Sequence, residues 1–277
     1  MIQEKVRVPD FASMKAHRHR ITMLTAYDYS FARIFDRAGI DAILVGDSLA
    51  TTFRGEQTTL AVTVDEVVYH TRAVVRARER ALVVADMPFL SYQVSAEDAL
   101  RNAGRLIKEG GAEAIKLEGG TAIAETIRRI AAIDIPVMGH IGLTPQSVHR
   151  MGGHRVQGRK SGRGAGCRER LIDDALAVEA AGAFAMVIEG VPPSLAREIT
   201  SRVSIPTIGI GAGSDCDGQV LVMHDMLGLN DSFKPRFAKS FADLGRSAAA
   251  ATECYIREVR EGHFPAAEHC YREAREN

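Results

Sequence analysis

The chain has 277 residues, of which 46% are hydrophobic, and this is enough to bury the core of one α/β domain. Lysine plus arginine and aspartate plus glutamate number 35 each, so the charge balance gives no reason to expect a nucleic-acid or anionic-membrane partner. No stretch reaches the roughly 18 apolar residues of a membrane-spanning helix, and the start lacks the apolar segment of a secretory signal, so we expect a cytoplasmic protein without membrane contact.

Eight short apolar runs recur along the chain and predict eight strands. They cover residues 21–28, 41–48, 81–89, 112–120, 135–142, 183–190, 205–213 and 220–228. Most of the intervals between them have the pattern of a helix. Strands that alternate with helices predict right-handed βαβ crossovers and a parallel sheet.

Eight such units favour an α/β fold of the closed (β/α)₈ barrel (TIM barrel) type. We expect a single barrel domain over residues 1–277, with a basic N-terminal lead-in over 1–20 and closing C-terminal helices within 236–260. The alternative is an open, doubly wound sheet. The first predicted strand is not followed by the G-x-G-x-x-G motif that would support that fold.

Capping signals indicate where several helices begin and end. Ser30 is expected to cap a helix that ends at Gly39. Thr63 and Glu66 form a capping-box pattern for the next helix, and the same pattern opens a helix over 95–110.

Two connections are long for simple turns. Residues 49–63 have no helical period, and we expect them to form a loop over the ligand site. Residues 142–166 are rich in glycine, arginine and histidine, and Thr144 before Pro145 can start a short helix there. The basic residues of 158–170 have the composition of a solvated loop.

An acidic residue stands where each of four predicted strands stops. These residues are Asp47, Asp86, Glu118 and Glu189. Because the carboxyl ends of parallel strands meet at one end of a barrel, we expect the four side chains to share that end, where α/β proteins bind ligands. The alternative interpretation is that each acid is a helix cap or a solvated loop residue.

Asp47, Asp86 and Glu118 are the candidate metal ligands. Hard oxygen ligands from separate strands suit Mg²⁺, which usually binds one or two carboxylates and leaves positions for substrate and water. Several carboxylates can share a site only if a cation offsets their repulsion.

Lys116 lies two residues before Glu118 on the same predicted strand, so both side chains point to the barrel interior. An ammonium group there needs a carboxylate partner or an anionic ligand. Lys116 is therefore either a substrate-binding residue or half of an internal ion pair with Glu118 that has no role in function.

Glu189 is the candidate base, because its apolar neighbours would raise the pKa of its carboxyl group toward the range useful for proton abstraction. His140, at the end of another strand, could contact a substrate oxygen or could be a structural histidine.

Zinc is disfavoured, since the spacing of His140, His149, His154 and Cys167 matches no closed motif. The cysteines are widely spaced, and we expect reduced thiols.

Several sequence blocks resemble the ketopantoate hydroxymethyltransferase family. The resemblance extends over about residues 21–270, and the longest block, GHIGLTPQSV, is highly specific. The blocks are TAYDYSFA (25–32), VGDS (45–48), YHTRAV (69–74), ADMPF (85–89), KLEGG (116–120), GHIGLTPQSV (139–148), VQGR (156–159), GIGAG with DGQ (209–219) and VMHDMLG (222–228).

The resemblance implies a (β/α)₈ barrel of the phosphoenolpyruvate/pyruvate superfamily and a step of pantothenate and coenzyme A synthesis. The family transfers a hydroxymethyl group from 5,10-methylenetetrahydrofolate to 3-methyl-2-oxobutanoate through a Mg-stabilised enolate, giving 2-dehydropantoate and tetrahydrofolate. Its members form large homo-oligomers, typically decamers.

The family's functional residues fall on matching positions of this chain. By resemblance, Asp47, Asp86 and Glu118 would hold Mg²⁺, and Glu189 would accept a proton. Asp47, Ser48, Asp86 and Lys116 would contact the 2-oxo acid.

The chain departs from the usual family pattern in its basic stretch KSGRGAGCRER (160–170), and no residue is assigned to the folate. Two other readings remain open. One is a folate-independent lyase of the superfamily acting on a Mg-bound 2-oxo acid, and the other is a barrel that binds an oxo acid without catalysis. A base in an apolar pocket argues against the second reading, because binding alone does not require one.

Overall fold

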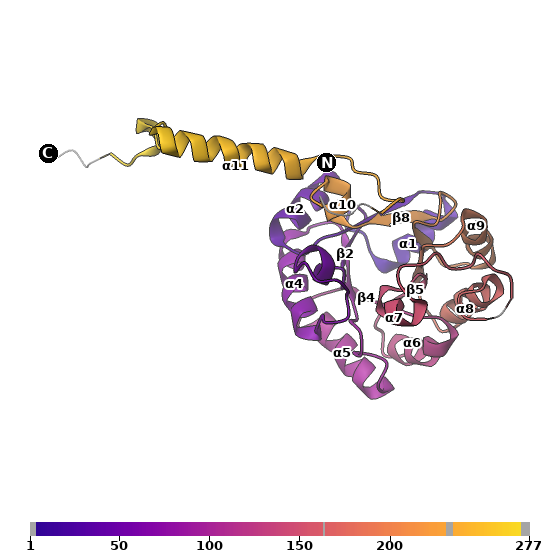
Figure 1. The fold of residues 1–277 in the computed structure, drawn as a ribbon. Helices are drawn as coiled ribbons and strands as arrows, with labels where there is room; N and C mark the ends of the chain where they lie inside the picture. The colour runs from indigo at the N-terminus through magenta and orange to yellow at the C-terminus, as the bar shows by residue number, and fades with distance from the viewer. Residues whose placement is uncertain (1–3, 163, 231–234, 273–277) are drawn as a thin grey trace. The chain divides into compact units, whose positions relative to one another are not determined.

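The computed structural model describes residues 4–162, 164–230 and 235–272 (Figure 1). The chain divides into two compact units, Met1–Met223 and His224–Asn277. The first unit holds the barrel. The second holds the long helix α11 (Leu244–Glu261), none of whose residues is buried. The expectation of one domain over the whole chain stays a prediction.

The first unit is a closed barrel of eight parallel strands, in which each strand pairs with the next and β8 pairs with β1. This confirms the predicted barrel and rules out the open sheet. The strands are β1 (Ile21–Thr25), β2 (Ala42–Val45), β3 (Leu82–Asp86), β4 (Ala114–Glu118), β5 (Val137–Gly142), β6 (Ala185–Glu189), β7 (Thr207–Ile210) and β8 (Gly218–Leu221).

Helices surround the strands, as Figure 1 shows for α2, α4, α5, α6, α8 and α9. The helices and 3₁₀ turns of this unit are α1 (Val8–Ala16), α2 (Tyr29–Ala38), α3 (Leu49–Thr52), α4 (Val64–Ala77), α5 (Ala96–Lys108), η1 (Thr121–Ile123), α6 (Ala124–Ala131), η2 (Pro145–Ser147), α7 (Val148–Met151), α8 (Arg168–Ala180) and α9 (Pro193–Arg202). The chain continues through α10 (Met223–Leu227), α11 and η3 (Ala267–His269).

Most predicted helix boundaries are confirmed, with two corrections. Thr63 and Glu66 form the expected capping box at the start of α4, and Gly39 ends α2 in the left-handed conformation at φ 92°. The cap of α2 is Asp28 rather than Ser30, because its carboxylate accepts the main-chain N–H of Ser30 at 2.7 Å and that of Phe31 at 3.0 Å. The connection 49–63 was expected to have no helix, but it opens with α3.

The eighth strand is a further correction, since it lies earlier than the expected 220–228. Gly218 pairs with Ile21 and Leu221 pairs with Leu24. The main-chain N–H of Met223 then donates to the Thr25 hydroxyl at 3.0 Å. A side-chain acceptor thus replaces the main-chain partner at this point, and the chain continues into α10.

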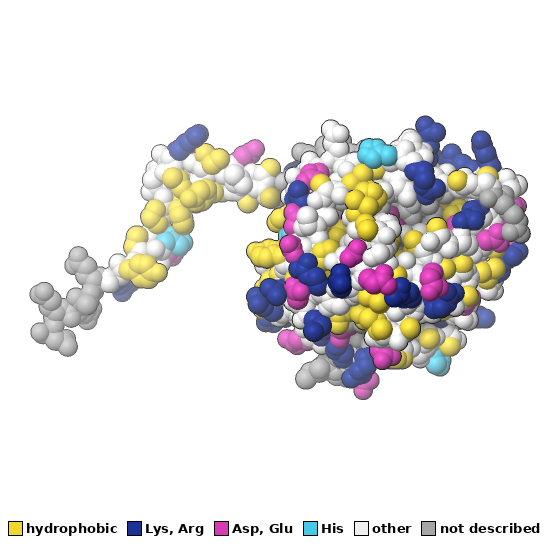
Figure 2. Space-filling view, turned by 90° about the horizontal axis from the view of Figure 1, so that it is seen from below, with side chains coloured by type: hydrophobic (Ala, Val, Ile, Leu, Met, Phe, Trp, Pro, Cys, Tyr) yellow, Lys and Arg dark blue, Asp and Glu magenta, His cyan; other side chains and the backbone are white. Residues whose placement is uncertain are grey.

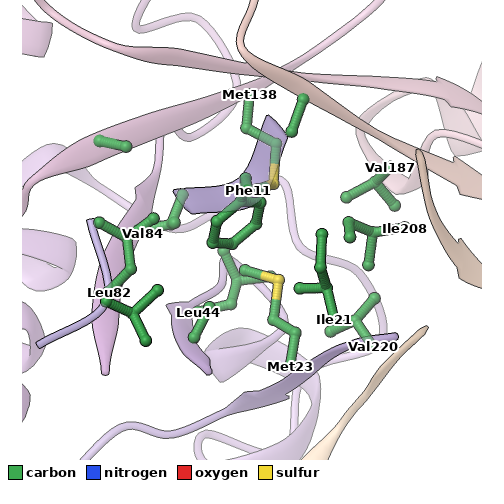
Figure 3. Close-up of a cluster of buried hydrophobic side chains, with 14 of the residues drawn as sticks. Phe11, Ile21, Met23, Leu44, Leu82, Val84, Met138, Val187, Ile208 and Val220 are labelled. Carbon is green, nitrogen blue, oxygen red and sulfur yellow. The ribbon is translucent and has the colours of Figure 1, made fainter. Parts of the chain in front are cut away.

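The N-terminal lead-in closes one end of the barrel. Phe11 of α1 is completely buried among residues from the amino ends of the strands, as Figure 3 shows. Its ring packs edge-on against Phe184, with centroids 5.5 Å apart. A large aromatic side chain fills the space that the small Ala42 and Ala114 leave in the same cluster. The helix therefore completes the core and leaves the opposite end for the site.

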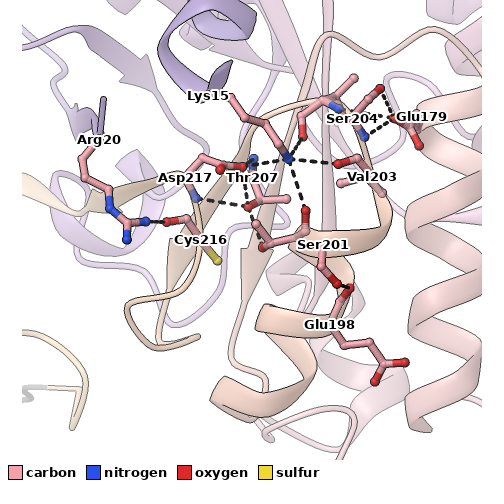
Figure 4. A network of polar contacts seen from close by, with 12 residues as sticks. Lys15, Arg20, Glu179, Glu198, Ser201, Val203, Ser204, Thr207, Cys216 and Asp217 are labelled. Carbon is pink, nitrogen blue, oxygen red and sulfur yellow. Dashed lines mark hydrogen bonds and ion pairs between the residues drawn. The ribbon is translucent and has the colours of Figure 1, made fainter. Parts of the chain in front are cut away.

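Lys15 anchors α1 to the amino end of the barrel (Figure 4). Its ammonium group donates to the carbonyl oxygens of Thr200, Val203 and Ile205 at 3.3, 3.0 and 2.9 Å, and it lies 3.1 Å from Asp217 Oδ2. Carbonyl groups at the end of α9 have no partner within their own helix. An ammonium group placed there donates hydrogen bonds to these carbonyl groups and also interacts favourably with the negative end of the helix dipole.

Acidic and basic side chains are interspersed over the face of the first unit shown in Figure 2. That distribution agrees with the equal numbers of acidic and basic residues in the chain. Across the described ranges, no helix has the length and apolarity needed to cross a membrane.

Candidate active site

Five ionisable side chains meet inside the barrel at the carboxyl ends of neighbouring strands. They come from β3, β4, β5 and the turn that follows β2, and each is at most 6% exposed. They are Asp47, Asp86, Lys116, Glu118 and His140. Strand register brings them together, because Asp86 is level with Lys116 and Glu118 is level with His140. Glu189, at the end of β6, adds a sixth group beside His140.

Lys116 forms its ion pair with Asp86, not with Glu118. The Nζ to Oδ1 distance is 2.9 Å, and both side chains are almost inaccessible to solvent. Burial on its own would lower the pKa of Lys116, but the charges of Asp86, Glu118 and Asp47 outweigh it and raise that pKa above its ordinary value. The ammonium is therefore charged at neutral pH, and the alternative pairing with Glu118 is wrong.

Asp47 is held by two hydrogen bonds that cross the barrel end. Its main-chain N–H donates to Asp86 Oδ2 at 2.9 Å, and its own Oδ2 accepts from the Gln146 amide at 2.8 Å. Burial, followed by the nearby charge of Asp86, raises the pKa of Asp47 to about 7. Ser48, the next residue, has its hydroxyl 2.8 Å from the hydroxyl of Tyr27.

Gln146 connects the carboxylates, although its local sequence does not mark it as a site residue. Its main-chain N–H donates to Glu118 Oε2 at 2.9 Å, while its side-chain amide donates to Asp47 and to the carbonyl of Met87 at 3.0 Å. The amide oxygen accepts from Tyr92 at 2.7 Å. The block GHIGLTPQSV, which contains Gln146, was the available signal for this residue. Within that block, Thr144 and Pro145 open the predicted short helical turn, η2.

The acidic set has the properties of a cation site. Glu118 Oε1 is buried and accepts no hydrogen bond, and burial with the charge of Asp47 raises the pKa of Glu118 well above its ordinary value. Three carboxylates face one ammonium, so a cation would offset the excess of negative charge.

These residues would not complete a coordination sphere alone. Within the described residues, no three His, Cys, Asp or Glu side chains are grouped closely enough to hold a metal. Mg²⁺ fits such a partial set, because it usually takes one or two carboxylates and fills its other positions with substrate and water.

His140 stands between the lysine and the candidate base. Its Nδ1 is 3.2 Å from Lys116 Nζ, and its Nε2 is 3.2 Å from Glu189 Oε2. Burial, and then the charge of Lys116, lower the pKa of His140 well below its ordinary value. The imidazole is therefore neutral at physiological pH.

Glu189 lies in a buried environment, as its apolar sequence neighbours predict. Burial raises the pKa of its carboxyl group to about 7, although Lys116 and His154 act in the opposite direction. Its side chain is 16% exposed. A carboxyl group with this pKa can exchange a proton with a ligand near neutral pH.

The fold and this cluster define the class of protein: a (β/α)₈ barrel with a buried acidic site at the carboxyl end of its strands, where barrel enzymes have their active sites. The chain belongs to the ketopantoate hydroxymethyltransferase family, whose family model matches residues 5–267.

Relatives of nearly the same length share more than half of the sequence. The 3-methyl-2-oxobutanoate hydroxymethyltransferase of Pelobacter propionicus is 59% identical over 270 residues, covering 98% of this chain and 98% of the relative. The enzymes of the same name from Geobacter metallireducens and Moorella thermoacetica are 57% and 56% identical and cover 98% of this chain, with 100% and 99% of their own lengths matched.

Solved structures resemble the fold at much lower identity. A phosphonopyruvate hydrolase in complex with oxalate and Mg²⁺ has a TM-score of 0.62 at 13% identity, covering 95% of this chain and 93% of that one. A 2,3-dimethylmalate lyase of the PEP mutase/isocitrate lyase superfamily has a TM-score of 0.60 at 16% identity, covering 94% and 90%. These likenesses show the same barrel fold.

Proposed function

We propose that this protein transfers a hydroxymethyl group from 5,10-methylenetetrahydrofolate to 3-methyl-2-oxobutanoate, giving 2-dehydropantoate and tetrahydrofolate for pantothenate synthesis. The observation that carries the proposal is the buried Lys116–Asp86 pair, 2.9 Å apart and beside Asp47, with Glu189 across His140 from it. Such a site suits a small anionic oxo acid. The name of the relatives, 3-methyl-2-oxobutanoate hydroxymethyltransferase, supports the choice of this particular reaction.

Asp47 and Asp86, with Glu118, would hold Mg²⁺ in this function. The bound ion would act as a Lewis acid that polarises the 2-oxo group and makes the neighbouring C3–H bond more acidic. Gln146 orients two of these carboxylates through its 2.8 and 2.9 Å hydrogen bonds, so a donor set drawn from different strands is fixed before the ligand arrives.

Lys116, Asp47, Ser48 and Asp86 would contact the oxo acid. Lys116 is the only one of the four with a positive charge, and it would attract the substrate's carboxylate and stabilise the negative charge that develops on its oxo group. Because Asp86 already fixes the ammonium, this stabilisation needs little reorganisation during the reaction.

Glu189 would remove the single proton from C3 of the substrate. The C3–H electron pair becomes the nucleophile, a carbon–carbon bond forms to the folate's one-carbon unit, and water supplies the hydroxyl group as tetrahydrofolate leaves. C3 then carries no hydrogen, so the product cannot lose a proton again at that carbon. Glu189 suits this step because its pKa of about 7 leaves a large fraction of it ionised near neutral pH and makes that carboxylate more basic than an ordinary one.

The experiment is to incubate the enzyme, Mg²⁺ and 3-methyl-2-oxobutanoate with folate labelled with ¹³C in its methylene group, and to analyse the product by mass spectrometry. We expect one labelled carbon in 2-dehydropantoate. The lyase reading predicts turnover of a 2-oxo acid without folate. The non-catalytic reading predicts Mg²⁺-dependent binding without product.

The proposal extends to the state of the protein. A homo-oligomer, with a decamer as the size suggested by family resemblance, and a cytoplasmic location both remain predictions. Light scattering coupled to gel filtration would measure the oligomer mass against the 30.0 kDa of one chain.

A further inference from the structure

Tyr92 is a buried tyrosine beside the acidic site to which the proposed reaction assigns no task. It is 2% exposed and lies in the connection between β3 and α5. Its hydroxyl accepts the main-chain N–H of Glu118 at 3.1 Å. The same oxygen is 2.7 Å from Gln146 Oε1 and 3.0 Å from the carbonyl oxygen of Glu118. The hydroxyl therefore joins the strand that carries one candidate metal ligand to the side chain that holds another, Asp47.

The surroundings of the Gln146 amide fix the direction of these hydrogen bonds. The carbonyl oxygen of Met87, 3.0 Å from the amide nitrogen, can only accept. A turned amide would place its oxygen against that carbonyl, acceptor against acceptor, whatever the charge of Asp47. The amide oxygen must therefore face Tyr92, and because this oxygen has no hydrogen, the Tyr92 hydroxyl is the donor in the 2.7 Å contact.

The hydroxyl is the better placed of two donors to this amide oxygen. The other is Gln93 Nε2 at 3.4 Å, which is close to the limit for a hydrogen bond. The Tyr92 hydrogen has a second acceptor within reach, the Glu118 carbonyl, but the Gln146 contact is the shorter by 2.7 to 3.0 Å. Tyr92 is thus the main restraint on the oxygen side of the amide.

Gln146 transmits this restraint to two carboxylates. Its amide nitrogen donates to Asp47 Oδ2 at 2.8 Å, and its main-chain N–H donates to Glu118 Oε2 at 2.9 Å. Two ionised carboxylates in one buried site repel each other, so donors that hold them must themselves be fixed. A glutamine side chain has several rotatable bonds, and the Tyr92 hydroxyl limits the rotation of its terminal amide.

The loop that carries Tyr92 is itself anchored. The Ser91 hydroxyl donates to the carbonyl oxygen of Pro88 at 2.6 Å, and the Asn102 amide of α5 donates to the carbonyl oxygen of Ser91 at 2.7 Å. These contacts fix the residue next to Tyr92 from two directions. The hydroxyl is therefore in place before any ligand arrives, as a precisely built site requires.

We propose that Tyr92 is a positioning residue that strengthens Mg²⁺ binding through Gln146, because its hydroxyl fixes the amide that holds Asp47. This inference rests on the proposed function, in which Asp47 and Glu118 are metal ligands. In this role Tyr92 acts through Gln146 and does not contact the metal or the substrate. Its removal should therefore change the affinity for Mg²⁺ and leave the proton-transfer step itself intact.

Tyr92→Phe tests the proposal, because it removes one oxygen atom and keeps the ring. Tyr69→Phe is the matched control, since Tyr69 of α4 is 72% exposed. Titration calorimetry of the full chain with Mg²⁺ alone measures the Kd of each variant. We expect the Kd to rise about 10-fold or more in Tyr92→Phe and to stay within about twofold of the wild type in Tyr69→Phe. An unchanged Kd in Tyr92→Phe, or an equal rise in the control, would overturn the proposal.

The rate of C3 proton exchange gives a second readout that a purely structural role would not produce. In Tyr92→Phe, exchange from 3-methyl-2-oxobutanoate in D₂O should require more Mg²⁺ than in the wild type and should recover the wild-type kcat once Mg²⁺ is saturating. A kcat that stays low at saturating Mg²⁺ would give Tyr92 a part in proton transfer and would contradict positioning through the metal site.

A double-mutant cycle separates the two routes by which the hydroxyl could act, through Gln146 or through the main chain of Glu118. Gln146→Leu removes the amide and keeps a side chain of similar size. In that background we expect Tyr92→Phe to change the Mg²⁺ Kd by less than about twofold, because residues that act through one another are not additive. An undiminished effect would assign the hydroxyl to Glu118 and refute the route through Gln146.

Asn102→Ala keeps the inference testable if a variant of Tyr92 or Gln146 does not fold, which thermal unfolding shows. It removes the 2.7 Å anchor of the Tyr92 loop from α5, and we expect the Mg²⁺ Kd to rise about threefold. An unchanged Kd would show that the fixed loop is not needed.

Failure of this inference can be told from failure of the proposed function. A wild type that binds Mg²⁺ but forms no 2-dehydropantoate would refute the function and leave the comparison of Kd values intact. Normal product formation with an unchanged Kd in Tyr92→Phe would refute the role of Tyr92 alone.

Discussion

Glu189 and Asp86 are both carboxylates at strand ends, but their surroundings suit opposite tasks. Asp86 lies 2.9 Å from a buried ammonium and accepts a main-chain hydrogen bond, so both of its oxygens are already engaged in binding contacts. Glu189 faces a neutral imidazole in an apolar setting, which favours a group that gains and loses a proton. The neighbours of each carboxylate therefore suit Asp86 to binding and Glu189 to proton transfer.

Replacing Glu189 with Gln removes the base and keeps the size of the side chain. We expect C3 proton exchange to fall about 10²- to 10⁴-fold while Mg²⁺ and 3-methyl-2-oxobutanoate still bind. Exchange is followed by proton NMR in D₂O, and binding by titration calorimetry. Undiminished exchange in Glu189→Gln would show that another group is the base.

The pH dependence of exchange follows from the same carboxyl group. Glu189 accepts a proton only when ionised, and burial raises its pKa to about 7. The rate should therefore be low under acidic conditions, reach half its maximum near pH 7 and level off above it. A rate that is flat from about pH 5 to pH 8 would contradict this assignment, because no group with such a pKa would then control the step.

Asp86→Asn tests the metal site. It removes one negative ligand and leaves Lys116 without its ion-pair partner, so we expect the Mg²⁺ Kd to rise about tenfold or more. Asp65→Asn is the matched control, since the Asp65 side chain is 79% exposed and lies outside the site. Calorimetry with Mg²⁺ measures both, and normal affinity in Asp86→Asn would remove Asp86 from the metal set.

At the scale of elements, α1 is part of the barrel core. Phe11 is 0% exposed and fills the amino end of the barrel, so Phe11→Ala should cost about 3–5 kcal/mol of unfolding free energy through lost contacts and a cavity. Phe11→Leu retains much of the volume and should cost clearly less. Urea unfolding measures both, and a loss below about 1 kcal/mol in Phe11→Ala would show that α1 is not structurally coupled to the barrel.

The order of elements could be predicted because it depends on local patterns. Buried runs such as 81–89 and capping residues such as Thr63 are visible in the sequence, and parallel strands place their carboxyl ends together. The residues at those ends, including Asp47 and Glu189, could therefore be found before the structure.

Contacts between distant residues could not be predicted in this way. The hydrogen bond from Gln146 to Asp47 joins residues 99 positions apart, and nothing in the local pattern of either residue specifies it. Lys116 could pair with Glu118 on its own strand, β4, or with Asp86 on the neighbouring strand, β3. Only the register of β3 and β4 decides between these two partners. The end of β8 depends likewise on the Thr25 hydroxyl of β1.

At the scale of the molecule, the barrel unit contains every residue assigned to the metal and to proton abstraction. The six ionisable residues of the site all lie within the unit Met1–Met223. In the other unit, α11 exposes Tyr255, Ile256 and Val259 at 58%, 40% and 44%. Exposed apolar side chains on one helix are compatible with the predicted homo-oligomer, for which the mass measurement is the test.

The most direct test of the account is proton NMR of 3-methyl-2-oxobutanoate in D₂O with the wild-type enzyme and Mg²⁺, before and after 5,10-methylenetetrahydrofolate is added. We predict Mg²⁺-dependent loss of the C3 proton signal before addition, and 2-dehydropantoate only afterwards. A C3 signal that persists, with no product after folate is added, would contradict the claim that these strand-end residues form a proton-abstracting site for a folate-dependent transfer.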